Sequence, residues 1–274
     1  MLSKRQQAIQ TMQTHEQMLQ CPLCKEVMTV AETGAVQCLN RHSYDIAKQG
    51  YVYLLTKPMQ SMYSKELFEA RHDVIASGLY DEVQQKVAKL LPKGRVLDTG
   101  CGEGSHLVRM LESRPDCTGI GIDIAKEAIV AAAKFATGPI WCVGDLANSP
   151  FAAGSFSSIL NFLSPANYDE FKRLLQPDGI VIKVVPEEGY LKELRAQAFA
   201  NSKKETYSND QTVQRFEENF QQVEKYRVTY SVPLQASLVP KLLQMTPMGW
   251  HIDNKENVQL PHITIDVSIL VGRV

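Results

Sequence analysis

Three cysteines and one histidine near the N-terminus have the types and the spacing of a metal site. Cys21-Pro-Leu-Cys24 is followed by Cys38-Leu-Asn-Arg-His42, which gives the pattern C-x2-C-x13-C-x3-H. Two close ligand pairs joined by a hairpin-length spacer suit tetrahedral zinc, and thiolates with imidazole favour zinc over calcium or magnesium. Four protein ligands complete the coordination shell, so the sequence predicts a structural zinc. The alternatives are a redox Cys-x-x-Cys pair, which leaves Cys38 and His42 unexplained, and buried thiols beside an unrelated histidine.

A glycine-rich stretch is the second feature that could do chemistry. Residues 95–104 have the sequence R-V-L-D-T-G-C-G-E-G, in which a short buried strand leads into a turn on Gly100, Gly102 and Gly104. Glycine is needed where the backbone turns sharply or lies directly against a ligand. The spacing differs from the dinucleotide-binding pattern. The glycines alone leave three interpretations open: a nucleoside-binding loop, a phosphate- or NAD-binding turn, or a chance cluster.

An acidic residue follows the glycine turn at the distance typical of nucleoside-binding folds. The segment 118–123, T-G-I-G-I-D, predicts a strand that ends at Asp123, about twenty residues after the turn. A carboxylate at this place can accept hydrogen bonds from both ribose hydroxyls. The alternative is a solvated aspartate that caps the helix expected at 124–135.

The elements around these residues alternate between strand and helix. Strands are expected at 95–98, 118–123, 140–143, 156–161 and 180–185, with helices at 105–111, 124–135 and 168–175 between them and a turn at 177–179. Such alternation predicts an α/β fold with a mostly parallel sheet. The segments 220–232 and 263–271 alternate apolar and polar residues and predict an antiparallel hairpin that closes the sheet. Further helices are expected at 64–76, 80–91, 187–200 and 236–244.

The spacing D-x-G-x-G-x-G in residues 98–104 resembles the signature of class I S-adenosylmethionine (SAM) methyltransferases. This resemblance, rather than the glycine spacing, implies SAM as the cofactor. It also implies a Rossmann-like sheet of seven strands, with the adenine near the segment that follows residues 140–143.

The zinc motif and the residues after it, N-R-H-S-Y-D-I-A-K-Q-G-Y-V-Y-L-L, resemble the bacterial 23S ribosomal RNA (guanine-N1-)-methyltransferases. That family carries a small zinc domain ahead of a class I methyltransferase domain. The segments A-R-H-D-V-I-A-S-G-L-Y and M-T-P-x-x-W are similar to the family as well. N-F-L-S-P-A-N-Y-D-E-F is similar to the Gram-positive branch, in which the methylation is linked to macrolide resistance. A homodimer that shares an RNA cleft is implied by the same likeness.

The resemblance assigns functional residues along the chain. The cofactor-binding residues it implies are Tyr80, Asp98, Gly100, Gly102, Glu103, Gly104, Asp123, Ile124, Asp145, Leu146 and Tyr190. Methylation of guanine N1 requires a base for the N1 proton. Asn161 is expected to line the reaction cavity and orient the base, and Asp145 and Glu187 are the candidate proton acceptors.

Three parts of the chain are expected: residues 1–55 as an N-terminal helix and zinc module that recognises RNA, 56–92 as a linker with helices packed on the core, and 93–274 as the methyltransferase domain. Basic and aromatic residues are interleaved after the zinc motif, as unpaired RNA requires for phosphate pairing and base stacking. They are Arg41, Tyr44, Lys48, Tyr51 and Tyr53. The alternative is that the tyrosines pack beneath the zinc site.

Composition narrows the function classes. The 274 residues carry a net charge of −1 with a pI of about 6.6, but residues 1–95 have a charge of +3 and the remainder −4. No apolar run is long enough to span a membrane and no secretory segment begins the chain, so a cytoplasmic protein is expected. The near-neutral pI keeps open a small-molecule methyltransferase with a zinc-bearing lid. A non-catalytic zinc protein that binds RNA is the other alternative.

Overall fold

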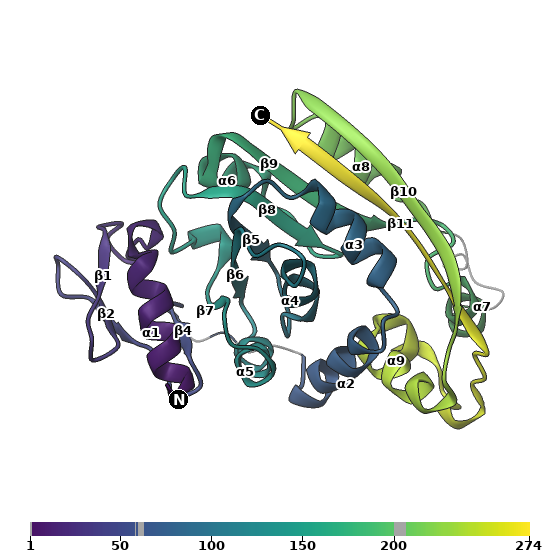
Figure 1. Ribbon diagram of the computed structural model, residues 1–274. Coiled ribbons are helices and arrows are strands. Elements are labelled where there is room, and N and C mark those ends of the chain that lie inside the picture. The colour runs from purple at the N-terminus through teal and green to yellow at the C-terminus, as the bar shows by residue number, and fades with distance from the viewer. Residues whose placement is uncertain (1, 58, 60–62, 200–206) are drawn as a thin grey trace.

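The computed structural model describes residues 2–57, 59, 63–199 and 207–274, and one large sheet forms its centre (Figure 1). The strand order is β10-β11-β9-β8-β5-β6-β7-β4. The strands of this sheet are β4 (Tyr51–Tyr53), β5 (Gly94–Thr99), β6 (Cys117–Asp123), β7 (Ile140–Val143), β8 (Phe156–Phe162), β9 (Leu175–Pro186), β10 (Gln222–Pro233) and β11 (His262–Arg273). Strands β4 to β9 pair in parallel, whereas β11 pairs antiparallel to both β9 and β10. The doubly wound α/β fold with a closing hairpin is confirmed.

Strand β4 makes the sheet one strand larger than the seven expected. It comes from the segment just after the zinc motif and pairs with β7, so that Tyr51 lies opposite Trp141 and Tyr53 opposite Val143. The zinc-bearing part and the methyltransferase part therefore share a sheet through a strand that lies inside residues 1–55.

Helices cover both faces of the sheet and one of its edges (Figure 1). The helices are α1 (Lys4–Thr14), α2 (Lys65–Ala76), α3 (Asp81–Leu90), α4 (Ser105–Leu111), α5 (Lys126–Phe135), α6 (Tyr168–Leu174), α7 (Lys192–Ala198), α8 (Asp210–Glu217) and α9 (Val239–Met245). Apolar residues of α3, α4 and α5 pack on one face, and those of α6 and α8 pack on the other. Helices α2 and α9 lie together below the edge at which the parallel strands end.

The glycine turn is held by an indole ring beneath it. Trp141 of β7 is buried, and a Cβ on Gly104 or on Gly121 would lie 2.3 or 2.4 Å from its ring carbons. Gly104 also has φ of +77°, a left-handed conformation that side chains disfavour. The two glycines thus let a strand, a turn and a large ring pack closely at the place where the turn begins helix α4.

The zinc motif lies in a small separate sheet of β1 (Met28–Val30), β2 (Ala35–Cys38) and β3 (Ser43–Asp45). Helix α1 packs beside it, at the purple end of the chain in Figure 1. Backbone hydrogen bonds from Gln20 to Pro150 and from Ala152 to Met18 join this ribbon to the core. Together with β4, these bonds attach the ribbon to the β7 side of the large sheet.

Several expected elements differ in extent. The turn expected at 177–179 lies inside β9, where the register against β8 shifts between Phe156 and Ser158 and forms a bulge. The helix expected at 187–200 is the shorter α7, and helix α8 has no counterpart among the expected elements. Residues 58 and 60–62 of the linker expected within 56–92, and residue 200 of the helix expected at 187–200, lie outside the described residues.

Candidate cofactor and metal sites

The four predicted zinc ligands come together at one point. Their ligand atoms all lie within 4.8 Å of one another, and among the described residues they form the one group of this kind. The sulfur atoms of Cys24 and Cys38 are 3.6 Å apart, and Nδ1 of His42 is 3.5 Å from the sulfurs of Cys21 and Cys38. A tetrahedron with Zn–S bonds of about 2.3 Å gives ligand separations of about 3.5–3.8 Å. These three separations match a tetrahedral zinc site formed by the four residues.

Neighbouring groups favour the thiolate of Cys24, whereas burial raises the pKa of Cys21. The backbone N–H of Glu26 and the side chain of Asn40 lower the pKa of Cys24 to about 6. The ring of Tyr44 lies beside the cluster with a buried hydroxyl, and burial together with the Cys21 thiol raises the pKa of Tyr44 to about 12. Tyr51 is buried as well. For these two tyrosines the structure shows packing, whereas Arg41 and Lys48 are exposed.

The predicted cofactor residues gather at the carboxyl ends of neighbouring parallel strands. Asp98 lies near the end of β5, Asp123 ends β6, Asp145 follows β7 and Asn161 lies near the end of β8. The backbone N–H of Gly144 donates to the carbonyl of Asp123 (3.0 Å), which brings the ends of β6 and β7 together. Ligands of open parallel sheets bind at this edge.

Asp98 is a buried carboxylate with an open hydrogen-bonding position. Its side chain is 1% exposed, and Oδ1 has no hydrogen-bond partner among the described residues. Burial raises the pKa of Asp98 to about 7; the nearby Asp123 and Glu103 carboxylates raise it as well, and the Arg71 guanidinium opposes them. Such a group is costly to bury alone, so a cationic ligand group is its natural partner.

Asp123 connects two parts of the site. Its Oδ2 accepts a hydrogen bond from the backbone N–H of Gly102 (2.9 Å) and its Oδ1 accepts one from Ala125 (2.8 Å). Burial raises the pKa of Asp123. A carboxylate has about four acceptor positions, so ribose hydroxyls can still be accepted while the glycine turn is held.

Helix α2 contributes a cation to this group of acids. Nε of Arg71 lies 3.0 Å from Oε2 of Glu103, and the Glu103 side chain is 1% exposed. A Cβ on Gly102 would lie 3.5 Å from Cζ of Arg71, so the guanidinium lies over the glycine turn. Sequence reasoning did not single out Arg71, although it lies inside the family-like segment A-R-H-D-V.

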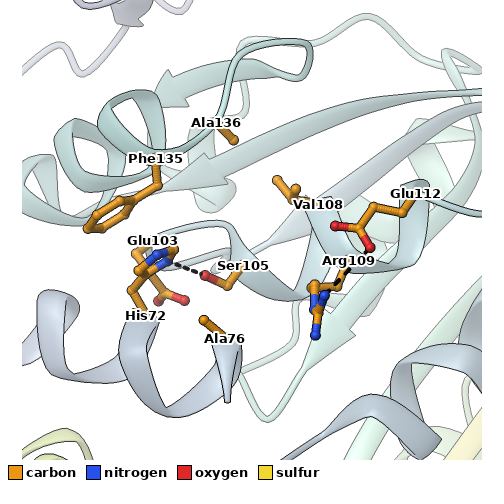
Figure 2. Close-up of a pocket in the computed structure, with 9 residues that line it drawn as sticks. All are labelled: His72, Ala76, Glu103, Ser105, Val108, Arg109, Glu112, Phe135 and Ala136. Carbon is orange, nitrogen blue, oxygen red and sulfur yellow. Dashed lines mark hydrogen bonds and ion pairs between the residues drawn. The ribbon is translucent and has the colours of Figure 1, made fainter. Parts of the chain in front are cut away.

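A cavity of about 160 Å³ lies next to the turn, between α2, α4 and α5 (Figure 2). It is lined by His72, Ala76, Glu103, Ser105, Val108, Arg109, Glu112, Phe135 and Ala136. Of the predicted cofactor residues, only Glu103 lines it. The His72 ring stacks on Phe135 with centroids 3.6 Å apart, and its Nδ1 lies 2.9 Å from the Ser105 hydroxyl. These contacts fix α2 against the turn.

Two of the predicted cofactor residues, Tyr80 and Tyr190, contact each other. The hydroxyls of Tyr80 and Tyr190 are 2.7 Å apart and both rings are buried. Tyr80 lies edge-on to the ring of His106, which stacks on Phe162 at 3.8 Å. Burial lowers the pKa of His106 well below its usual value, with a further contribution from Arg71, so that the ring is neutral. Both tyrosines lie close enough to Arg71 to influence its pKa, and their contact with the cofactor stays a prediction.

Asn161 is fully buried and its amide is fully used by the protein. Its Nδ2 donates to Oγ1 of Thr99 (3.1 Å) and to the carbonyl of Pro165 (2.8 Å), and its Oδ1 accepts from Nζ of Lys183. Lys183 also donates to the carbonyl of Ser164 (2.9 Å). Burial lowers the pKa of Lys183 to about 8. In this structure Asn161 holds the loop after β8 and does not present a free amide.

The loop after β8 touches the glycine turn. A Cβ on Gly100 would lie 2.1 Å from the Ser164 hydroxyl, and Leu163 adopts a left-handed φ of +52°. Lys183 therefore fixes a loop that lies directly beside the turn. In the sequence, Lys183 stands out as a lone lysine in the apolar run I-V-I-K-V-V, and the sequence alone assigned it no role.

The remaining candidate acids have other local partners. Asp145 is partly buried and its Oδ1 accepts a hydrogen bond from the backbone N–H of Ala147 (2.8 Å), which begins the short helix Leu146–Asn148. Glu187 accepts a hydrogen bond from the Ser268 hydroxyl and lies 3.5 Å from Nζ of Lys225. Ile124 and Leu146 are partly buried at the ends of β6 and β7.

Comparison with known proteins identifies the family. Residues 19–65 match the zinc-ribbon family described as "RlmA, N-terminal", and residues 90–228 match a "Methyltransferase domain" family. YxjB of Bacillus subtilis (strain 168), a protein assigned to the 23S rRNA (guanine-N(1)-)-methyltransferases, is 39% identical over 273 residues, which cover 93% of this chain and 96% of YxjB. The chain belongs to the 23S rRNA (guanine-N1-)-methyltransferase family. The 23S rRNA (guanine(748)-N(1))-methyltransferase of Streptomyces fradiae is 27% identical over 271 residues, covering 93% of this chain and 96% of that protein.

Membership of this guanine-N1-methyltransferase family makes SAM the methyl donor and zinc the structural metal, and the residues present fit both. Among the buried polar atoms at the turn, Oδ1 of Asp98 has no hydrogen-bond partner, and Arg71 and Glu103 form an ion pair at 3.0 Å without a hydrogen bond between them. A ligand that carries an ammonium, a sulfonium and a carboxylate supplies partners for such a set. None of the helices among the described residues is long and apolar enough to cross a membrane.

Proposed function

We propose that this protein methylates N1 of one guanine in a hairpin loop of 23S ribosomal RNA. The observation that carries the proposal is that a zinc ribbon is joined through β4 to a methyltransferase sheet, at whose edge the buried Asp98 carboxylate has an oxygen without a hydrogen-bond partner. Relatives that align along nearly the whole chain support it. The specific residues and domain limits below belong to the same proposal.

The cofactor supplies an electrophilic methyl group, and the protein holds it at the ends of β5, β6 and β7. We assign Asp98 to the ammonium and Asp123, with Ile124, to the ribose. Asp145 and Leu146 border the adenine, and Gly100, Gly102 and Gly104 allow the backbone to approach the ligand. Glu103, Tyr80 and Tyr190 surround the charged end of the cofactor.

Methyl transfer to guanine N1 requires alignment of the acceptor and removal of its proton. Lys183 and Asn161 position the loop Leu163–Pro165, which would form the wall of the acceptor pocket next to Gly100. Asn161 thus orients the guanine indirectly, by positioning this loop. Asp145 remains the proposed acceptor of the N1 proton. A guanine in a folded loop has to leave its stack before it enters such a pocket.

The ribbon would deliver the RNA. We propose the divisions 1–55, 56–92 and 93–274, with the first as the RNA-recognition module. Exposed Arg41 and Lys48 supply phosphate contacts there, whereas Tyr44 and Tyr51 support the ribbon from within. The substrate places the enzyme with the ribosomes in the cytoplasm. The homodimer implied by the family resemblance stays a prediction.

A deletion strain tests the proposed function. Reverse transcription of 23S RNA stops at 1-methylguanosine because the methyl group blocks the pairing edge of the base. We expect one stop in a hairpin loop of the parental RNA to vanish in the deletion strain and to return with the intact gene. The same strains report the macrolide-resistance role, as a lower tolerance of tylosin after deletion. An unchanged stop at every guanine contradicts the proposal.

A further inference from the structure

Helix α2 places one cation among three acids at the edge of the sheet. The acids are Asp98, Glu103 and Asp123, all of which lie close enough to Arg71 to influence, or be influenced by, its charge. Among the described residues, Arg71 is the only cation that influences the pKa of Asp98. The site as a whole therefore carries an excess of negative charge with a single guanidinium inside it.

The guanidinium is held on one side and open on the other. Its Nε faces Oε2 of Glu103 at 3.0 Å, and its terminal nitrogens make no hydrogen bond to the described residues. The side chain is 24% exposed, whereas Glu103 is almost fully buried. An arginine offers five donors in a planar fork, so one edge can stay with Glu103 while the other binds a second carboxylate.

The part of α2 around Arg71 is held by contacts with two neighbouring helices, α5 and α9. Lys134 of α5 pairs with Glu69 (3.0 Å) and Lys241 of α9 pairs with Asp73 (2.6 Å). The His72 ring lies on Phe135 of α5 (Figure 2). Helix α2 thus presents Arg71 to the glycine turn in a defined orientation, close to Gly102.

The charges of the cofactor match this arrangement. Its amino-acid end carries an ammonium and a carboxylate; Asp98 suits the first, but a buried carboxylate near three acids needs its own cation. We propose that Arg71 binds the carboxylate of the SAM methionine moiety and thereby makes α2 part of the cofactor site. This inference rests on the proposed binding of SAM at the glycine turn, and it adds the residue that binds the methionine carboxylate.

Two ligands that differ in this one group test the inference. Calorimetry on the full-length, zinc-loaded protein would compare SAM with decarboxylated SAM, which keeps the ammonium, sulfonium and nucleoside. We expect Arg71→Gln to weaken SAM binding at least thirtyfold and to change the affinity for decarboxylated SAM less than threefold. Arg215→Gln, a matched change of an exposed arginine on α8 that lies over the ring of Tyr168, should change neither affinity.

Other outcomes overturn the inference in distinguishable ways. Equal losses for the two ligands would make Arg71 a residue that only holds α2 in place, and no loss would remove it from the site. If Arg71→Gln does not fold, Arg71→Lys replaces it as the test, because lysine keeps the positive charge but loses the planar pair of donors. Arg71→Lys should weaken the binding of SAM more than the binding of decarboxylated SAM. Failure of the wild-type protein to bind either ligand would instead contradict the proposed function.

Discussion

Replacing Asp98 with asparagine is expected to weaken SAM binding at least a hundredfold while making the ligand-free protein more stable at alkaline pH. The carboxylate is 1% exposed, has an unpartnered oxygen and has a pKa raised to about 7, mainly by burial. The groups that face it are Glu103 and Asp123, which raise this pKa, and Arg71, which lowers it. Asparagine keeps the shape but removes the charge that an ammonium requires.

The sign of the stability effect follows from the two pKa values of Asp98. In the unfolded chain the pKa is 3.8, and in the folded protein it is about 7. The folded state therefore holds its proton more tightly, and the stability that this proton provides is lost as the pH rises from about 4 through about 7. The difference corresponds to at most about 4 kcal/mol at pH 8. The melting temperature of Asp98→Asn should thus exceed that of the wild type by more at pH 8 than at pH 5.

The measurement for Asp98 combines calorimetry with melting curves at the two pH values. Wild-type affinity for SAM should also fall as the pH drops below about 7, because the ligand-free carboxyl then becomes protonated. Asp178→Asn, a change at an exposed position in the β9 bulge, is the matched control and should affect neither quantity. Binding of SAM by Asp98→Asn within tenfold of wild type would contradict the assignment.

Loss of one zinc ligand should abolish RNA methylation and leave cofactor binding almost unchanged. The ribbon has three short strands and depends on Cys21, Cys24, Cys38 and His42 for cohesion. Structural zinc contributes on the order of 10 kcal/mol to such a module. We expect Cys38→Ser to lose its zinc and to methylate 23S RNA at least a hundredfold more slowly, with an affinity for SAM within threefold of wild type.

The separation of effects is expected because the SAM residues lie at the ends of β5, β6 and β7, whereas the ribbon is attached beyond β7 through β4. Bound zinc can be counted by atomic emission, and methylation by label transfer. Cys117→Ser, at a half-buried thiol outside the cluster, should retain zinc and activity. Full activity of a zinc-free Cys38→Ser protein would show that the ribbon has no part in RNA recognition.

The core of the fold could be predicted because each of its parts has a local signal. Short apolar runs that end in Asp98 and Asp123 mark parallel strands, and Ser64, whose hydroxyl accepts a hydrogen bond from the backbone N–H of Leu67, marks the start of α2. Strand β4 has only three residues, too few for periodicity, and its partner β7 lies about ninety residues away. The bulge in β9 likewise depends on pairing with β8, so Pro177-Asp178-Gly179 was interpreted as a turn.

The site residues that belong to a short sequence motif could be predicted. Those that reach the site only through tertiary contacts could not. The zinc ligands and the glycine turn lie within short segments, so their grouping follows from sequence. Arg71 reaches the turn only because α2 packs on α4, α5 and α9. The role of Lys183 depends on the register that places it opposite Asn161 in β8 and β9. The lone lysine in the apolar run I-V-I-K-V-V marks Lys183 as unusual but does not reveal its partner, and the contact of Arg71 leaves no pattern in a single sequence.

The most direct measurement is transfer of a labelled methyl group from SAM to 23S RNA that lacks the modification, with mapping of the labelled nucleoside. Purified, zinc-loaded protein should add about one methyl group per RNA, recovered as 1-methylguanosine from one hairpin loop. No transfer to RNA, label in a different nucleoside, or turnover of a small molecule in RNA-free extract would contradict a guanine-N1 methyltransferase of 23S ribosomal RNA.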